Sequence, residues 1–366
     1  MDGMHGLIGE EQAMFAEAVR RFGEREYGDG SAPHRLGFDR ARLRRLGELG
    51  CLALAVPEER GGIGGPVEAM AALAALAPFM VPEPLIASGV HAASLIAVAA
   101  GEAAAARLLP GIAAGETVAV VADLEDGARY DRGHVRATAR RTARGYLLDG
   151  FKPMVPFGAE ADLIIASARL DGDVALFVVW PGGGVERTPS PRIDGLPAAD
   201  ITFLSCSVAE EDRLDAAPAI EALERAADVA TAAQTAEMVG LMDALNAATM
   251  EYTRTRRQFG VPVASFQALQ HRIADMWIAC EETRSMAAAA ALACGAGDAT
   301  RSRTVSAAML IACDAAQRVA NEAIQMHGGI GTTDELIVSH WYRRLAALRQ
   351  ELGDRRSHLA RLAAVA

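Results

Sequence analysis

RRQFGVPVASFQALQHRIADM, residues 256–276, contains a short turn between two long stretches whose apolar residues recur at helical spacing. The same spacing continues toward the C-terminus, where Gly295 interrupts it and Gly328-Gly329 ends a third stretch. Four helical blocks result: Ala219–Arg256, Phe266–Cys294, Thr300–His327 and Asp334–Gln350. Four long helices with short connections predict an antiparallel four-helix bundle over residues 211–366.

Upstream of this bundle the pattern changes twice. Between Thr117 and Val208, short β-branched or alternating runs are separated by Gly, Asp and Pro clusters. This pattern predicts a small antiparallel, barrel-like β domain over residues 116–210. Before it, apolar residues return at helical spacing, as in Glu10–Glu26, and predict a helical domain over residues 1–115. The predicted fold is therefore mainly α, with a small β domain between two helical domains.

The composition excludes several classes of protein. Hydrophobic residues make up 51% of the 366 residues and aromatic residues 5%, a balance that suits closely packed, alanine-rich helices. The net charge of −11 argues against non-specific nucleic-acid binding, although local cation clusters decide whether an anionic ligand binds. Five scattered cysteines without a CxxC pair indicate reduced thiols. Without a signal peptide or an apolar stretch long enough to span a bilayer, we expect a cytoplasmic protein with no membrane insertion.

The segment Arg256-Arg257-Gln258-Phe259-Gly260 carries residue types that suit a phosphate-containing ligand. An arginine pair at a helix C-terminus can make forked, charge-assisted hydrogen bonds to a pyrophosphate. Phe259 can pack on a flat ring, and Gln267 offers both a donor and an acceptor. The alternative interpretation is that the cations complement the helix dipole and the aromatic residues are core.

A second segment, Gln325-Met326-His327-Gly328-Gly329-Ile330-Gly331, is rich in glycine. Glycines let the backbone approach a ligand closely and present N–H groups to a phosphate. The alternative is a simple helix C-cap, which is common. The GxGxxG dinucleotide motif does not occur after any predicted strand.

Together these segments resemble the acyl-CoA dehydrogenase family. Residues 256–276 are similar to its signature helix-turn-helix, AIQMHGGIGTTDEL (323–336) to its second signature, and LAVPEERGG (54–62) to a motif of its N-terminal domain. The helix–sheet–helix order covers essentially the whole chain. The pattern GTTDELIVSHWYRRL…LGDRRSHLARLA (331–345 and 352–363) most resembles bacterial small subunits of pimeloyl-CoA-type dehydrogenases.

The resemblance implies that FAD binds at a subunit interface. It implies that Arg256 and Phe259 contact the pyrophosphate and adenine of FAD, with Gln267 assisting. It also assigns three residues of the second signature to the same cofactor from the neighbouring subunit: Gln325, Gly328 and Gly329. An obligate oligomer follows, expected as a dimer of dimers.

The resemblance further implies flavin-dependent α,β-dehydrogenation of an acyl-CoA thioester. In the family a carboxylate removes the α-proton while the β-hydride passes to the flavin, and the product is a trans-2-enoyl-CoA. The reduced flavin then passes its electrons to an electron-transferring flavoprotein. The expected partners are therefore an acyl-CoA, that flavoprotein and a second subunit, identical or homologous.

The catalytic base is where this chain departs from the family. Counted without gaps from Gln325, the position of the family's catalytic glutamate falls on Leu352, and the alternative position used by some members falls on Ala230. Neither side chain can accept a proton. Glu351 and Asp354 lie one and two residues from the first position and are the candidates for the base. The alternative for Glu351 is a solvated carboxylate at a helix end.

Other departures concern the flavin ring and the substrate. The family's Thr-Glu-Pro, Gly-Ser-Asp and Trp-Ile-Thr segments read here as Leu124-Glu125-Asp126, Arg129-Tyr130-Asp131 and Met154-Val155-Pro156. An arginine common at the start of the long helix aligns with Thr231. The hydroxyl that meets flavin N5 in the family is therefore missing, whereas the pyrophosphate and adenine contacts are kept.

Three further titratable residues have more ordinary explanations. We expect His327 and His340 to serve in packing or on the surface, and Glu237 to face a polar groove or pair with an arginine rather than remain an isolated buried carboxylate. Because few histidines occur and none lies at ligand spacing from Cys or carboxylates, no metal site is predicted.

Three functional hypotheses follow. The chain is one subunit of a heteromeric acyl-CoA dehydrogenase whose base comes from a partner, or a self-sufficient homo-oligomer that uses Glu351 or Asp354. In a different class, it is a non-catalytic scaffold subunit that binds acyl-CoA or FAD.

Overall fold

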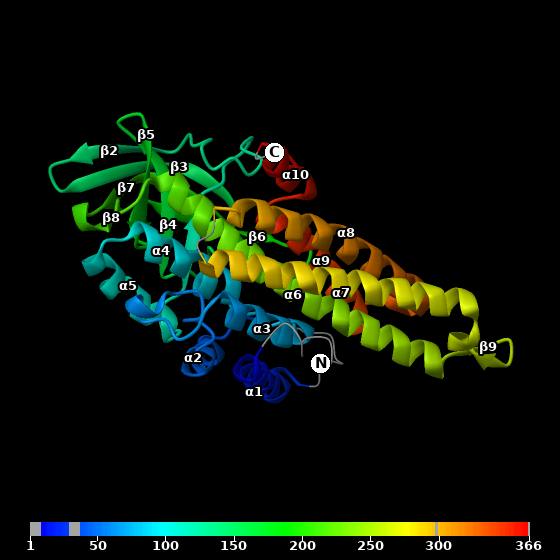
Figure 1. Cartoon of the computed structure of the whole chain (residues 1–366). Helices are drawn as coiled ribbons and strands as arrows, with labels where there is room; N and C mark the ends of the chain where they lie inside the picture. Colours follow the sequence, from blue (N-terminus) through cyan, green and yellow to red (C-terminus); the bar gives the residue numbers. More distant parts are fainter. Residues whose placement is uncertain (1–8, 29–36, 297–298, 365–366) are drawn as a thin grey trace. The chain divides into compact units, whose positions relative to one another are not determined.

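The computed structural model describes residues 9–28, 37–296 and 299–364, so most of the segment inspected for a signal peptide lies outside the described residues. The chain forms two compact units (Figure 1). The sheet unit comprises residues 38–65 and 83–230, and the bundle unit comprises the N-terminal segment, residues 66–82 and the chain from residue 231 onward. The long helix α6 (Ala219–Thr255) begins in the first unit and ends in the second. The predicted domain boundaries near residues 115 and 210 remain predictions.

The sheet unit combines short helices with a mixed sheet. Its helical elements are α2 (Arg40–Glu48), η2 (Glu58–Arg60), η4 (Leu85–Ala92, a π-helix), α4 (Ala93–Ala99), α5 (Glu102–Ala113) and η5 (Glu210–Asp212). Its strands are β1 (Ala119–Ala122), β2 (Thr138–Thr142), β3 (Gly145–Pro156), β4 (Leu163–Leu170), β5 (Asp173–Val179), β6 (Val185–Pro191), β7 (Pro197–Val208) and β8 (Arg213–Leu214).

The sheet is open rather than a closed barrel. Its strand order is β6-β7-β3-β2-β4-β5-β8, and β1 pairs with β4 in parallel. The other neighbours are antiparallel except at one point, where Thr138 of β2 pairs in parallel with Arg169 of β4. The remainder of β2 has only β3 beside it, because its register with β4 stops there. The prediction of a purely antiparallel domain is therefore corrected for β1 and for this one pair.

The core of the sheet unit lies between its helices and one side of the sheet. Leu95, Ile96 and Ile112 from α4 and α5 share one buried cluster with Leu163 and Leu176 from β4 and β5. Burying side chains of this size stabilises a fold by about 1.5–3 kcal/mol each. The residues that alternate with them point to the opposite face of the sheet. On β4 and β5 these residues, such as Ile164 and Phe177, are buried as well, so both faces of these strands are covered.

The bundle unit confirms the predicted helices of the C-terminal region. It contains the later part of α6 and the elements α1 (Glu10–Tyr27), α3 (Pro66–Leu76), η3 (Ala77–Phe79), β9 (Arg257–Gln258), β10 (Val261–Pro262), η6 (Val263–Ser265), α7 (Gln267–Ala296), α8 (Arg301–His327), η7 (Gly328–Thr332), α9 (Ile337–Glu351) and α10 (Arg355–Ala364). Helix α10 was not expected as a separate element; it begins after Gly353 and packs on α8.

Small side chains let the helices of this unit approach closely. Ala236, Ala279 and Ala316 are buried in one cluster with Met242 and Trp341. The indole nitrogen of Trp341 donates to the carbonyl oxygen of Pro78 over 3.0 Å, so α9 is joined to the η3 segment by a hydrogen bond as well as by packing. The alanine-rich, aromatic-poor composition thus appears in the structure as close helix packing.

Two features of the described residues bear on the expected cellular setting. All five cysteines are buried and free of disulfides. No described helix is both long enough and apolar enough to cross a bilayer.

Candidate functional site

The hairpin that follows α6 presents Phe259 to solvent under backbone strain. Strands β9 and β10 pair antiparallel, and Phe259 and Gly260 connect them with φ angles of 53° and 83°. Arg257 Nη2 donates to the carbonyl oxygen of Gly260 over 2.8 Å and stabilises the turn. Two-residue hairpin turns favour Asn-Gly or Gly-Gly because positive φ is needed, so a bulky aromatic residue is costly there. The Phe259 side chain is 92% exposed, and a strained, exposed aromatic residue is typical of a contact to a ligand or partner.

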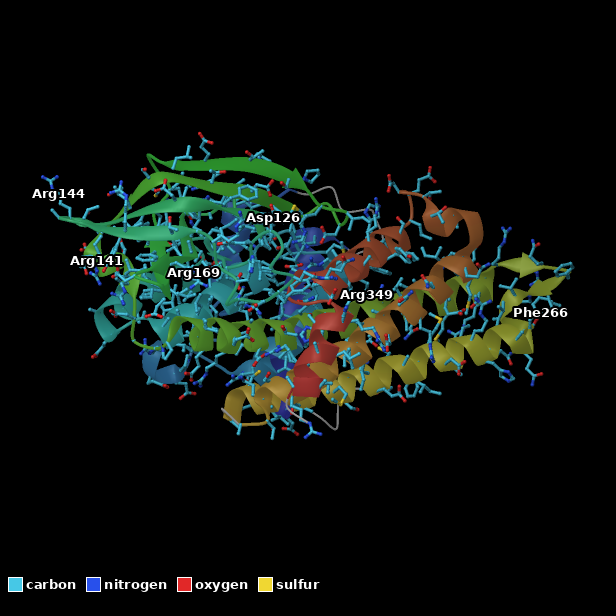
Figure 2. All side chains as sticks on the ribbon, turned by 90° about the horizontal axis from the view of Figure 1, so that it is seen from above. Asp126, Arg141, Arg144, Arg169, Phe266 and Arg349 are labelled. Carbon is cyan, nitrogen blue, oxygen red and sulfur yellow. The ribbon has the colours of Figure 1, made fainter. Side chains whose placement is uncertain are left out.

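The residues around this hairpin are also open to solvent. Arg256 and Gln267 are exposed, and Arg256 makes no ion pair with any described residue. The ring of Phe266 lies against that of Phe259, edge to face, with centroids 6.2 Å apart. Figure 2 shows Phe266 at the end of the bundle helices. The exposed Arg256 and the ring of Phe259, which has Phe266 against it, are therefore both accessible at this end of the bundle.

The glycine segment after α8 leaves its backbone accessible. Gly328 has a φ of +68°, and its N–H donates to the carbonyl oxygens of Gln325 and Ile324 as a helix cap. A Cβ added at Gly328 or Gly329 would meet nothing within 4 Å. The helix-cap interpretation is therefore confirmed, and the open space beside Gly329 leaves room for a ligand to approach the backbone.

The two segments, about seventy residues apart in sequence, lie at the same end of the bundle. The ring of Tyr252, in the last turn of α6, stacks on the imidazole of His327, with centroids 4.6 Å apart. Arg272 of α7 pairs with Glu322 of α8 close by. One chain therefore brings the arginine–phenylalanine hairpin and the glycine turn together, although their assignment to FAD stays a prediction.

His327 joins these elements as a buried packing residue, as expected. It is 4% exposed, and its Nδ1 lies 2.8 Å from the carbonyl oxygen of Ala323. Burial lowers the pKa of His327, and the hydrogen bond to Ala323 opposes this shift only in part. The imidazole therefore favours its neutral form in the folded chain.

These features fit FAD. A pyrophosphate needs cations and a backbone that it can approach closely; Arg256 is an exposed cation, and the glycine segment leaves open space beside its backbone. An adenine needs a flat apolar surface, which Phe259 provides. Because each of these groups faces solvent in the single chain, the arrangement also fits a cofactor covered by a second subunit.

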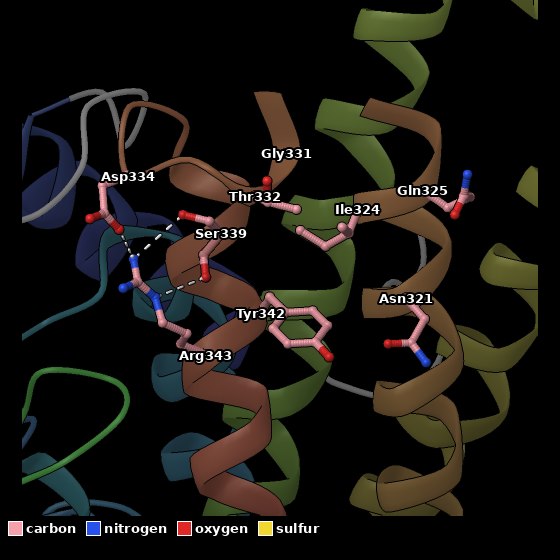
Figure 3. A pocket seen from close by; sticks show the side chains of 9 residues that line it. All are labelled: Asn321, Ile324, Gln325, Gly331, Thr332, Asp334, Ser339, Tyr342 and Arg343. Carbon is pink, nitrogen blue, oxygen red and sulfur yellow. Dashed lines mark hydrogen bonds and ion pairs between the residues drawn. The ribbon is translucent and has the colours of Figure 1, made fainter. Parts of the chain in front are cut away.

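A cavity of about 530 Å³ opens beside the glycine turn, between α8 and the start of α9 (Figure 3). Arg343 donates to the carboxylate of Asp334 over 2.6 Å and to the carbonyl oxygen of Ser339 over 3.3 Å. The residues that line the cavity are Asn321, Ile324, Gln325, Gly331, Thr332, Asp334, Ser339, Tyr342 and Arg343. The sequence placed Gln325 near a ligand but did not predict this cavity, because the walls of the cavity come from two helices that are brought together only by folding.

Both candidate bases are engaged in contacts within the bundle unit. Arg344 lies 3.3 Å from Glu351 and 2.6 Å from Glu237, and the Glu351 side chain is only 13% exposed. Asp354 is the N-cap of α10, where its Oδ1 accepts the N–H of Ser357 over 2.7 Å. The interpretation of Glu351 as a solvated carboxylate is therefore wrong, because the ion pair with Arg344 holds it inside. The expected arginine partner of Glu237 is confirmed.

His340 and the predicted base positions complete this region. The Nε2 of His340 lies 3.1 Å from the carbonyl oxygen of Asp334, at a half-buried position near the start of α9, in agreement with the surface role expected. Leu352 follows α9, and Ala230 is fully buried. Among the described residues, no group of three or more His, Cys, Asp or Glu side chains is arranged to hold a metal ion.

The sheet unit contains a buried ionic network that sequence reasoning missed. The Nζ of Lys152 donates to Glu125 over 2.7 Å and to Ser167 over 2.9 Å, and Lys152 has no exposed surface. Asp123 accepts a hydrogen bond of 2.7 Å from Arg132. Burial lowers the pKa of Lys152, whereas the bond to Glu125 opposes the shift. The sequence around Lys152 does not predict this network, because its partners Glu125 and Ser167 come from other parts of the chain.

The same network holds the loop between β1 and β2, where the resemblance placed altered substrate contacts. Burial would raise the pKa of Glu125, but Lys152 and the N–H groups of Ala137 and Arg136 keep it below its usual value. At the tip of the loop, Arg129 and Tyr130 have φ angles of 47° and 81°. Consecutive non-glycine residues in this region are uncommon and strained.

The segment that aligns with the family's Trp-Ile-Thr lies on β3. Met154 has a φ of 53°, and its N–H donates to Asp200 over 2.8 Å. Its side chain is 48% exposed. This position therefore offers a thioether where the family has a tryptophan, and Pro156 provides no hydroxyl.

Comparison with known proteins places the chain in a family context. Residues 9–116 match the family model described as acyl-CoA dehydrogenase, N-terminal domain. Residues 220–366 match the model described as acyl-CoA dehydrogenase, C-terminal domain. The acyl-CoA dehydrogenase FadE27 of Mycobacterium tuberculosis is 30% identical over 340 residues, which cover 89% of this chain and 87% of the relative.

Solved structures share the architecture over nearly the full length. The ChsE4-ChsE5 complex from Mycobacterium tuberculosis aligns with a TM-score of 0.85 at 26% identity, covering 98% of this chain and 97% of that one. Butyryl-CoA dehydrogenase from Megasphaera elsdenii aligns with a TM-score of 0.89 at 23% identity, covering 98% of each chain. The second likeness establishes the fold alone.

Proposed function

The chain belongs to the acyl-CoA dehydrogenase family, and from this premise we propose that it is one subunit of a heteromeric enzyme whose catalytic base comes from a partner. Membership makes it an FAD-dependent oxidoreductase that acts on the CH–CH bond of an acyl-CoA. The proposed product is a trans-2-enoyl-CoA. The proposed electron acceptor is an electron-transferring flavoprotein.

The main support for this proposal is that both carboxylates near the expected base position, Glu351 and Asp354, already have structural partners. Leu352 and Ala230 stand where a glutamate is expected and cannot accept a proton. Glu351 is held by Arg344, and Asp354 caps α10. A general base must come within hydrogen-bond reach of the proton it removes. Releasing Glu351 would break one of the ion pairs of the buried Arg344, and releasing Asp354 would remove the cap of α10.

The chain's own contribution would then be cofactor binding. FAD, when bound, supplies the hydride acceptor. Arg256 would bind its pyrophosphate and Phe259 would pack on its adenine, while the open backbone at Gly328 and Gly329 admits the same cofactor from a second subunit. Because the hairpin and the helix cap already hold the backbone of these segments, little backbone ordering would be needed on binding.

The comparisons are consistent with a heteromer. The ChsE4-ChsE5 structure is a complex of two differently named proteins, and its matched chain covers nearly all of this one. We propose by analogy that this chain also assembles with a homologous chain that carries the missing glutamate.

Flavin reduction by the isolated and the assembled protein tests the proposal. We expect the purified chain to bleach flavin absorbance at least about 100-fold more slowly with acyl-CoA than the chain co-expressed with a homologous subunit, since general base catalysis contributes about 10²–10⁴-fold. A mixture in which only the partner's glutamate is replaced by glutamine should fall to the rate of the isolated chain. Full activity of the isolated chain would contradict the proposal.

Substitution of Glu351 and Asp354 distinguishes the proposed heteromer from a self-sufficient homo-oligomer that uses one of these carboxylates as its base. In the assembled enzyme, Glu351→Gln and Asp354→Asn should leave the rate of flavin reduction within about twofold of the original. Thermal unfolding of each variant provides the control, because both residues stabilise the bundle unit. Abolished flavin reduction in a variant that remains folded would assign the base to this chain.

A further inference from the structure

The chain carries its positive charge almost entirely as arginine. Of its 36 lysine and arginine residues, only Lys152 is a lysine. The two side chains differ as nucleophiles, because a lysine amine can lose its proton and attack, whereas a guanidinium stays protonated in proteins. Lys152 therefore carries the single side-chain amine of the sequence that can react with an electrophile.

The fold buries that amine completely. Lys152 lies on β3 and has no exposed surface. Its Nζ donates to Glu125 over 2.7 Å and to Ser167 of β4 over 2.9 Å. Glu125 also accepts the backbone N–H groups of Arg136 and Ala137, so the loop before β2 is fixed to the same cluster. A reagent can therefore reach the amine only after this part of the sheet unit has opened.

The thiols of the chain are protected in the same way. All five cysteines are buried. The thiolate is the nucleophilic form of cysteine, and burial raises the pKa of Cys51 to about 12 and that of Cys313 to about 11. Burial also raises the pKa of Cys206, and that of Cys280, where Asp243 acts in the same direction. The thiols of these four residues therefore stay protonated at neutral pH.

An acyl-CoA is an acyl donor to amines and thiols. When a neutral amine attacks the thioester carbonyl carbon, a C–N bond forms, the C–S bond breaks, CoA leaves as a thiolate and the nitrogen gives up one proton. The resulting amide is stable, whereas an acylated thiol is another thioester, from which free CoA can take the acyl group back. Every accessible lysine of a protein that acts on acyl-CoA is therefore open to acylation by the substrate.

We propose that Lys152 is the single side chain of this protein that acyl-CoA thioesters acylate stably, and that the folded sheet unit keeps it closed to them. The inference rests on the acyl-CoA substrate of the proposed function and is independent of where the catalytic base lies. Burial lowers the pKa of Lys152, while Glu125 opposes the shift. A lowered pKa favours the neutral, nucleophilic amine, so the protection comes from burial rather than from protonation.

Acylation of an opened chain should also hinder its return to the native fold. An amide at Lys152 carries no charge, so Glu125, whose side chain is 4% exposed, would be buried without its cation. The acyl group would also need space where the lysine side chain already has no exposed surface. The modification would thus mark chains whose sheet unit has opened and keep them from closing.

A bias of the whole composition toward arginine is the competing explanation. It accounts for the small number of lysines, but it does not account for the position of the remaining one, because lysine is among the residues least often fully buried. A structural role of the ion pair between Lys152 and Glu125 is compatible with the proposal, since the same burial provides the protection.

Peptide mapping by mass spectrometry after incubation of the whole chain with acetyl-CoA at mildly alkaline pH tests the proposal. Relative to free Nα-acetyl-lysine in the same solution, Lys152 should react at least about 100-fold more slowly in the folded protein than in guanidinium chloride, because only about one molecule in 10³ or fewer is unfolded under native conditions. The matched control is Arg44→Lys, which places an amine at an exposed position of the sheet unit. That new amine should react equally fast in the folded and the unfolded chain.

The effect on folding is measured with the same samples. Chains acetylated at Lys152 in guanidinium chloride and then refolded should unfold at a lower midpoint than mock-treated chains. Folded Arg44→Lys acetylated at its new amine should keep its midpoint, which shows that an acetyl group alone does not destabilise the chain.

Three results would overturn the proposal. They are acetylation of Lys152 in the folded protein as fast as that of the amine introduced by Arg44→Lys, absence of acetylation at Lys152 in guanidinium chloride, and an unfolding midpoint that acetylation of Lys152 leaves unchanged. Acetyl-CoA has no β-carbon from which a hydride could be removed. The outcome is therefore independent of dehydrogenation, and the failure of either proposal can be recognised separately.

Discussion

At the scale of single residues, the protonation of buried His327 should make the stability of the folded chain depend on pH. Its imidazole is buried against Tyr252 next to the glycine turn, and burial lowers its pKa. In an unfolded chain histidine titrates near about 6.5. The unfolded state therefore binds a proton at a higher pH than the folded state does.

This sign predicts a loss of stability in mild acid. The free energy of unfolding should be highest above about pH 6.5 and fall as pH decreases from there toward the lower pKa of folded His327. His327→Phe, which keeps a stacking ring but cannot titrate, should flatten the decline. Urea unfolding between pH 7.5 and 5 measures it. An equal decline in both proteins would show that other groups are responsible.

At the scale of elements, the contact between α3 and α6 depends on one glycine. A Cβ at Gly240 would overlap the backbone oxygen of Ala74 and lie 2.8 Å from the Cβ of Ala77. No flexible side chain is available to move aside, so the two helices would have to separate.

Gly240→Ala should therefore lower the free energy of unfolding by about 1–3 kcal/mol, the usual cost of overpacking. Gly295→Ala in α7 is the control, because its Cβ would meet Pro66 at an ordinary 3.7 Å. That variant should be neutral or more stable by up to about 1 kcal/mol, since alanine favours a helix over glycine. Urea unfolding compares the two, and equal stability would show that α3 can shift without cost.

At the scale of the whole molecule, α7 exposes apolar surface that an oligomer would cover. Trp277 and Ile278 are 57% and 50% exposed on a helix that otherwise contributes to the bundle core. Large apolar side chains, and tryptophan in particular, are common at the centre of protein interfaces.

Trp277→Glu should shift the protein toward a smaller oligomer, because a charge at the core of an interface is costly to bury. Leu359→Glu on α10 is a matched control, since Leu359 is similarly exposed at 51%. Light scattering after size-exclusion chromatography reports the mass of each variant. An unchanged mass for Trp277→Glu would place the subunit interface elsewhere.

Much of this molecule was accessible from its sequence. Helical periodicity predicted α1 from Glu10 onward, and the glycine pair correctly marked the end of α8. Strand β6 was missed because its sequence, VERTPSP, has few apolar residues and two prolines. Prolines are tolerated there because β6 is at the edge of the sheet, where a missing donor costs little.

The sequence by itself determined the helical blocks, the existence of a small sheet and the family, because local periodicity and contiguous motifs depend only on neighbouring residues. Only the tertiary structure decided that Tyr252 meets His327, that Lys152 is buried on Glu125 and that Arg344 holds Glu351. These contacts join residues from different elements. Whether a carboxylate is available to act as a base depends on such partners, and chain position alone does not specify them.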